Sequence, residues 1–279
     1  TSLPGPHGIG ELGHEATAFL DFLAETGQAL WQVLPLGPTG YGDSPYQCFS
    51  AFAGNPLLVS LDRLCEEGLL TASDLKRRIE FPAGEVDFGP VIEFKQPLLA
   101  KAFAAFEKKA PPKHREALEA FTNEQAAWLH DFALFMALKR ANGGAAWSSW
   151  DRALVNRDAE ALERARRELE REVREVAFEQ WLFFEQWAGI QRQARERGIR
   201  ILGDIPIFVA QDSADVWAHP EIFHLAADGR PALQAGVPPD YFSATGQLWG
   251  NPLYRWDALA RTGYAWWIER FRAVLALVD

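Results

Sequence analysis

Apolar and polar positions along the chain repeat two patterns in a fixed order. Residues 16–25 place apolar side chains at helical spacing and end at Thr26-Gly27, which predicts a helix with a glycine stop. Residues 29–36 are a short, nearly continuous apolar run that leads into glycine and proline, which indicates a buried parallel strand followed by a loop. The same order returns where a helix ending at Gly198 precedes the apolar run 199–206. Two such helix–strand units predict an α/β fold.

A long charged stretch with helical periodicity lies between these units. Apolar residues at spacings of three, four or seven predict one amphipathic helix over 113–142 and a second over 158–197. The charges on the other faces are typical of solvated helix surfaces. We therefore expect a helical insertion between two strands of one sheet.

Composition narrows the class of partner. The 279 residues contain 28 Lys and Arg against 38 Asp and Glu, a net charge of −10, with 11 Trp and 19 Phe. An acidic chain without a basic stripe argues against nucleic acid and anionic membranes as partners. Cys48 and Cys65 have neither disulfide nor zinc-site spacing, and every apolar run is too short for a membrane span. We expect a cytoplasmic protein.

The loop after the first predicted strand, residues 37–56, has the composition of a sugar site. Loops after parallel strands converge on one face, where α/β proteins place function. Tyrosine rings stack on the apolar face of a pyranose, while Asp43, Ser44 and Gln47 can hydrogen-bond its hydroxyl groups. The alternative is a rigid surface loop whose tyrosines only pack.

The loop after the second predicted strand carries an acid at the strand end. A carboxylate there is costly unless it is partnered, so we expect Asp204 to face a polar site or an arginine, with a structural ion pair as the alternative. Further along, Asp212, Ser213 and Asp215 have the pattern of a helix N-terminus.

Residues 234–254 form a third unusual stretch. A double proline, glycines and aromatic residues predict a long shaped loop, rather than a helix or strand, that acts as a lid or substrate wall. Gln247 and Trp249 are two residues apart, so in an extended conformation both point to one side and can contact one ligand. The alternative is that the aromatic residues only pack the loop onto its scaffold.

Several motifs of other chemistries are missing from the sequence. It has no Walker loop, no strand-coupled G-x-G-x-x-G, no G-x-S-x-G and no H-E-x-x-H. Hydride, phosphoryl and zinc chemistry therefore lack support, and we expect no metal and no cofactor.

Four strings resemble one family over the whole chain. They are LPLGPTGYGDSPY at 34–46, SAFAGNP at 50–56, GDIPIF at 203–208 and GVPPDYFS at 236–243. These strings resemble amylomaltases, the bacterial 4-α-glucanotransferases of the α-amylase superclan. The resemblance implies a (β/α)8 TIM barrel with helical insertions. It also implies transfer of α-1,4-glucan segments to a glucose or glucan acceptor with retention, through a covalent glycosyl-enzyme.

The resemblance also implies binding roles for the first two loops. Ser44 and Tyr46 match residues that line the sugar site, and Tyr41 matches an aromatic residue of a secondary glucan-binding patch. Asp204 matches the acid after the third barrel strand, which supports the catalytic subsite. The implied partners are maltooligosaccharides, amylose and starch-type α-glucans.

The third loop is assigned in the same way. Tyr241 and Phe242 match the tip of a mobile loop, while Gln247 and Trp249 match residues that contact sugar near the scissile bond. An aromatic, proline-rich loop over the acceptor side would keep water from the covalent intermediate, which favours transfer over hydrolysis.

One departure from the family bears on activity. The nucleophilic aspartate lies in an R-x-D-H motif, which this sequence lacks; that aspartate, the acid/base glutamate and the stabilising aspartate are expected beyond Asp279. We expect 1–61 to begin the barrel with its second strand, 62–190 to be the helical insertion and 191–279 to hold the third strand, mobile loop and following helix. The chain alone is then expected to be inactive. The alternatives are a noncatalytic glucan-binding fragment and a retaining α-glucan hydrolase of the same superclan.

Overall fold

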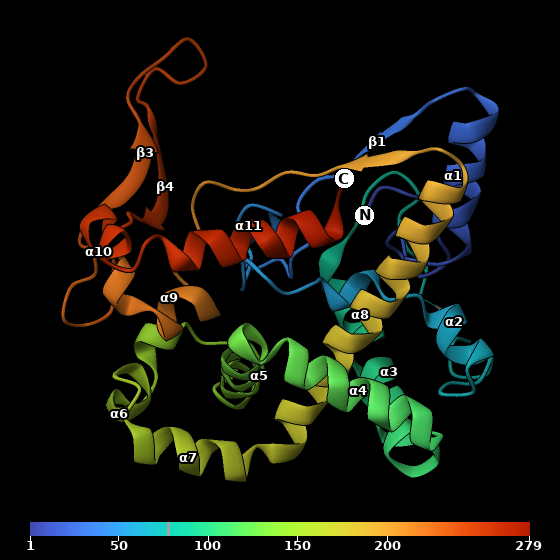
Figure 1. Ribbon diagram of the computed structural model, residues 1–279, viewed down its shortest axis with the longest axis horizontal. Coiled ribbons are helices and arrows are strands. Elements are labelled where there is room, and N and C mark those ends of the chain that lie inside the picture. Colours follow the sequence, from blue (N-terminus) through green and yellow to red (C-terminus); the bar gives the residue numbers. More distant parts are fainter. Residues whose placement is uncertain (77–78) are drawn as a thin grey trace.

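The computed structural model describes residues 1–76 and 79–279, and it pairs the two predicted strands (Figure 1). β1 (Leu30–Gln32) and β2 (Arg200–Leu202) run parallel, with Trp31 opposite Ile201. Both strands are shorter than the apolar runs predicted. Pro35 and Pro206 stand in those runs and have no N–H to donate, and the chain leaves the ladder before it reaches them.

Helices account for most of the remaining chain. The first, α1 (His14–Glu25), ends as predicted ahead of Gly27. Gly27 has a φ of 72°, a left-handed conformation that glycine adopts without steric cost because it has no Cβ. The others are α2 (Leu61–Glu66), α3 (Phe88–Lys109), α4 (Pro112–Glu124), α5 (Ala126–Ala141), α6 (Arg152–Val155), α7 (Ala159–Glu168), α8 (Glu170–Glu196), α9 (Ala214–Ala218), α10 (Trp256–Arg261) and α11 (Ala265–Leu277). None of the helices within the described ranges is long and apolar enough to cross a membrane.

Both long predicted helices are in fact pairs of helices. The prediction over 113–142 is wrong at Gln125, which caps the end of α4 and the start of α5 with φ −96° and ψ 9°. The prediction over 158–197 is wrong at Leu169, which separates α7 from α8 in the same way. Apolar spacing continues across each break because the helices on both sides pack apolar residues on a core, half-buried in α4 and buried in α5, α7 and α8. Periodicity alone therefore conceals the change of direction.

Two apolar cores meet along α8, the longest helix. Phe178, Phe183 and Ile190 of α8 pack in the core that also holds α1 and α3. Val176 and Ala177 of the same helix pack in the core that holds α5, α7 and α9. This helix therefore joins the part of the molecule that holds β1, β2 and α1 to the helical block formed by α5, α6, α7 and α9 (Figure 1).

The third stretch contains strands, which corrects the prediction of a loop without elements. β3 (Gln234–Val237) and β4 (Gln247–Pro252) form an antiparallel hairpin with a register shift between Gln234 and Gly236. A Cβ on Gly236 would lie 2.4 Å from the Gln247 carbonyl oxygen, so the close approach of the two strands requires glycine. The hairpin projects away from the helical block, at the upper left of Figure 1.

Candidate functional site

A hydrogen bond between distant loops marks the centre of the site. The Tyr46 hydroxyl donates to Asp204 Oδ2 at 2.5 Å, across 158 positions of sequence. The two residues meet because β1 and β2 are parallel neighbours, so the loops after them leave from the same edge. This bond to the carboxylate raises the pKa of Tyr46 above its usual value. The expectation that Asp204 faces a polar partner is met by a tyrosine rather than by an arginine.

All three loops surround one open cavity of about 520 Å³. Its walls combine hydroxyl, amide and carboxylate groups with apolar rings, the mixture that orients and stacks a sugar. The lining residues are Ser44, Tyr46, Gln47, Asp204, Ile205, Pro206, Ile207, Phe208, Trp249 and Asn251.

The hairpin strand β4 provides one wall of this cavity. Trp249 Nε1 donates to Gln247 Oε1 at 3.1 Å, so the two side chains lie together as their spacing predicts. The Trp249 ring centroid is 6.3 Å from that of Phe208, which belongs to the loop after β2. Trp249 is 44% exposed and can therefore contact a ligand.

Other residues predicted for the site lie elsewhere. Tyr241 and Phe242 are 97% and 89% exposed at the hairpin tip and are not among the residues that line the cavity. Asp43 lies in the short 3-10 turn Tyr41–Asp43 with φ 53° and is also outside the lining. The side chain of Tyr41 lies outside the part of the structure that is described.

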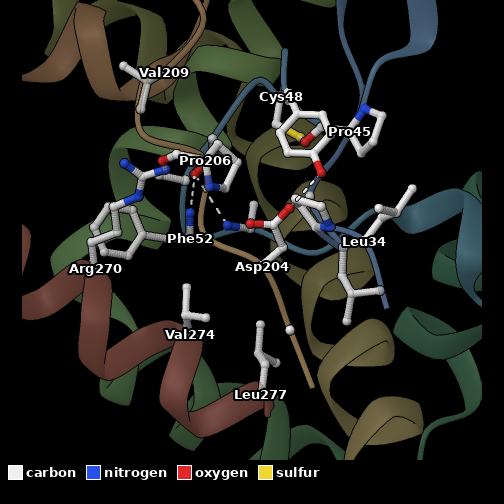
Figure 2. Close-up of a pocket in the computed structure, with 18 of the residues that line it drawn as sticks. Leu34, Pro45, Cys48, Phe52, Asp204, Pro206, Val209, Arg270, Val274 and Leu277 are labelled. Carbon is white, nitrogen blue, oxygen red and sulfur yellow. Dashed lines mark hydrogen bonds between the residues drawn. The ribbon is translucent and has the colours of Figure 1, made fainter. Parts of the chain in front are cut away.

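A smaller pocket of about 70 Å³ lies at the base of the site (Figure 2). Val274 and Leu277 of α11 point into it from one side, while Asp204 and Pro45 lie on another. Burial raises the pKa of the Cys48 thiol here to about 12. A thiol that stays protonated at neutral pH is a poor nucleophile.

Arg270 of α11 anchors the loop that carries Asp204. Its Nη2 donates to the Pro206 carbonyl oxygen at 2.6 Å, and its Nη1 donates to the Tyr254 hydroxyl at 3.3 Å. Arg270 is only 2% exposed, and its guanidinium carbon lies 4.9 Å from the centroid of the Trp267 ring. The sequence does not predict the role of Arg270, because arginines are common on amphipathic helices and the pattern does not show which of them is buried.

Asp212, Ser213 and Asp215 divide into one cap and two cross-links. Ser213 caps α9 by accepting from the Val216 N–H, as predicted. Asp212 instead accepts from Lys139 of α5, and Asp215 accepts from the Ala51 N–H at 2.8 Å. Asp212 therefore joins the loop after β2 to α5, and Asp215 joins α9 to the loop after β1.

A possible metal-ligand cluster lies apart from the cavity. Ligand atoms of His7, Glu11 and Asp62 lie within 4.8 Å of one another. The buried ammonium of Lys95 donates to Glu11 and to the Val59 carbonyl oxygen, so a cation already neutralises this carboxylate. Burial lowers the pKa of Lys95, whereas for Glu11 the cost of burial is outweighed by Lys95 and His7, and its pKa is lowered. We interpret the cluster as a structural ion network.

Comparison with protein families matches residues 1–279 to glycoside hydrolase family 77, which is described as 4-alpha-glucanotransferase. The chain belongs to this family. A 4-alpha-glucanotransferase of Thermus thermophilus is 57% identical over 277 residues, which are 99% of this chain and 55% of that protein. The chloroplastic/amyloplastic DPE1 of Arabidopsis thaliana is 41% identical over the whole chain and 48% of its own length.

Solved structures agree with the family. The amylomaltase of Streptococcus agalactiae, solved in complex with acarbose, is 42% identical with a TM-score of 0.96, covering 100% of this chain and 56% of its own. The amylomaltase of Corynebacterium glutamicum, at 19% identity and a TM-score of 0.74, shows the shared fold. The predicted α/β class, part of a TIM-barrel-type fold with helical insertions, is confirmed. The chain spans about half the length of the Thermus thermophilus, Arabidopsis thaliana and Streptococcus agalactiae proteins.

Proposed function

We propose that this chain carries the sugar-binding part of a 4-α-glucanotransferase. The supporting observation is the cavity of about 520 Å³ in which Tyr46, Asp204 and Trp249, from three separate loops, come together. In the proposed reaction, an α-1,4-glucan segment moves to the 4-hydroxyl group of a glucose or glucan acceptor with retention. The proposed substrates are maltooligosaccharides, amylose and starch-type α-glucans, in the cytoplasm.

The number of carboxylates in the cavity limits the catalytic roles that these residues can fill. A retaining mechanism needs two carboxyl groups about 5 to 5.5 Å apart, one as nucleophile and one as acid/base. Among the cavity residues in the described ranges, Asp204 is the one carboxylate, and it already accepts the Tyr46 hydroxyl. We therefore assign Asp204 a supporting role, and we place the nucleophile, the acid/base and the stabilising aspartate in sequence outside these 279 residues.

We propose binding roles for the remaining residues as well. Trp249 stacks on a sugar ring, while Gln247 and Ser44 hydrogen-bond its hydroxyl groups. The hairpin tip with Tyr241 and Phe242 covers the acceptor side and excludes water. In this proposal Tyr41 belongs to a secondary glucan patch, with Asp43 beside it, and residues 62–190 form the helical insertion between barrel strands.

A noncatalytic glucan-binding role is the second candidate for the isolated chain. The single cavity carboxylate favours it, because binding needs the aromatic and amide walls but no pair of carboxyl groups. A retaining hydrolase of the same superclan is distinguished from a transferase by its products.

Incubation with maltotriose separates these possibilities. The protein as encoded by its gene should convert maltotriose into glucose and longer maltooligosaccharides while the number of reducing ends stays constant. Residues 1–279 alone should give no conversion. A rise in reducing ends would identify a hydrolase instead, and failure of the gene-encoded protein to convert maltotriose would contradict the proposed transfer. Turnover by residues 1–279 alone would contradict the assignment of the catalytic carboxylates.

A further inference from the structure

We propose that Asn251 is a positioning residue, whose buried side chain holds the β3–β4 hairpin so that Trp249 faces the Tyr46–Asp204 pair. The proposal rests on the proposed function, because it concerns how the sugar site is assembled. It concerns an amide that need not touch sugar itself.

The Asn251 amide contacts the other two loops at once. Its Nδ2 donates to the Val209 carbonyl oxygen at 2.8 Å, in the loop after β2. Its Oδ1 accepts from Gln47 Nε2 at 3.0 Å, in the loop after β1. A carbonyl oxygen can only accept, so the Val209 contact fixes which end of the amide faces which partner. One side chain therefore cross-links all three walls of the cavity.

Burial makes this cross-link expensive to break. Asn251 is 4% exposed, whereas the three residues at the start of β4 are exposed. A buried amide that loses its partners has no water to replace them. Asn251 is therefore the anchored end of a strand whose other end is open to solvent.

The anchor lies close to the sugar-facing residues. Gln47 Nε2 is also 3.4 Å from the Trp249 carbonyl oxygen, so the same glutamine contacts the backbone of the tryptophan itself. Trp249 and Asn251 both line the cavity. A shift of Asn251 would move the Trp249 ring relative to Asp204, and misplacement by about 1 Å can cost on the order of 100-fold in rate.

A double-mutant cycle in the gene-encoded protein tests the proposal. We expect Asn251→Ala to lower kcat/KM for maltotriose by roughly 10- to 100-fold. In a Trp249→Ala background, the same change should cost no more than about two-fold, because the residue to be positioned is gone. Asn251→Asp keeps the volume and the Gln47 contact but cannot donate to Val209, so it should resemble Asn251→Ala.

Asn142→Ala is the matched control. Asn142 Nδ2 also donates to a backbone carbonyl oxygen at 2.8 Å, that of Leu138, but at the exposed end of α5. This variant should leave kcat/KM within about two-fold of wild type. Additive losses in the Asn251 and Trp249 double variant, or wild-type kinetics for Asn251→Ala, would overturn the proposal.

Hydrogen exchange tests the positioning without reference to sugar. Backbone amides of β3 and β4 should exchange at least about ten-fold faster in Asn251→Ala than in wild type, and Asn142→Ala should not change them. Unchanged exchange in the hairpin would overturn the proposal even if maltotriose is a substrate. If the hairpin exchanges faster in Asn251→Ala but the gene-encoded protein does not convert maltotriose, the positioning role of Asn251 is supported and the proposed function is contradicted.

Discussion

The position of Asp204 at the end of a strand predicts that its carboxylate has a partner, but not which partner. Its place after an apolar run indicated a partnered carboxylate, and the structure gives it the Tyr46 hydroxyl. The identity of the partner was not predictable, because it depends on which loop leaves the neighbouring strand. Asn251 and Arg270 were missed for a related reason: their partners lie 42 to 204 and 16 to 64 positions away, and neither residue belongs to a local pattern.

Replacing Asp204 should affect turnover more than affinity. Asp204→Asn keeps the shape but removes the charge that accepts the Tyr46 hydroxyl, and hydrogen bonds to charged groups contribute about 1.5 to 3 kcal/mol. In the gene-encoded protein, we expect kcat on maltotriose to fall by roughly 10- to 100-fold while KM changes by less than about three-fold. Asp257→Asn, at an exposed site on α10, is the control. Wild-type turnover in Asp204→Asn would assign Asp204 a structural role.

At the scale of elements, the sequence predicts that most of the helices and the two parallel strands exist, but not where they begin and end. The helix–strand order placed α1, β1, α8 and β2 in sequence, yet both long helices divide and the third loop contains a hairpin. Gln125 and Leu169 carry no proline or glycine signal, so only the packing of the helices on the two cores specifies the breaks. The β3–β4 pairing was hidden by glycines and prolines that are more typical of loops.

Two glutamines of α8 hold the end of the first loop and the residues that follow it. Gln180 pairs with both backbone groups of Gly54, at 2.8 and 2.9 Å, and Gln186 does the same with Ser60, at 2.7 and 3.4 Å. Each unpaired buried group costs about 1 to 3 kcal/mol, so Gln180→Leu should lower Tm by roughly 5 to 15 °C. Gln191→Leu, which removes an exposed bond to Ala276, should change Tm by less than about 3 °C. Equal Tm values for the two variants would contradict this role of α8.

Asp215 joins α9 to the first loop and gives the fold a pH dependence. Burial raises the pKa of Asp215 above its ordinary value, although the Ala51 N–H and Arg270 oppose the shift. The folded state therefore binds this proton more tightly than the unfolded state, so wild type loses stability as pH rises through the two pKa values. Asp215→Asn still accepts from Ala51 and does not titrate.

The free energy of unfolding should reveal this difference when measured by urea denaturation between pH 3 and pH 8. Relative to wild type, Asp215→Asn should gain stability as pH rises above about 4 and then reach a plateau. The opposite slope, with wild type gaining on the variant, would show that the charged carboxylate is favoured in the folded protein.

At the scale of the whole molecule, the described residues contain fewer strands than the (β/α)8 barrel that the resemblance implies. β1 and β2 are the parallel pair, and the chain spans about half the length of its curated relatives. The sequence strings were specific enough to indicate this family, since they fall in the three loops that surround the cavity. The exposed hairpin was not predictable from strings, because it depends on how β3 and β4 pair.

Sugar binding by Trp249 tests the central claim most directly. Isothermal titration of maltoheptaose into the gene-encoded protein compares Trp249→Ala with Trp256→Ala, which removes a tryptophan that is 54% exposed on α10 and outside the cavity. We predict that Trp249→Ala weakens binding by about 1 to 3 kcal/mol, whereas Trp256→Ala leaves it unchanged. Equal affinity in Trp249→Ala and wild type would contradict a sugar site between the three loops.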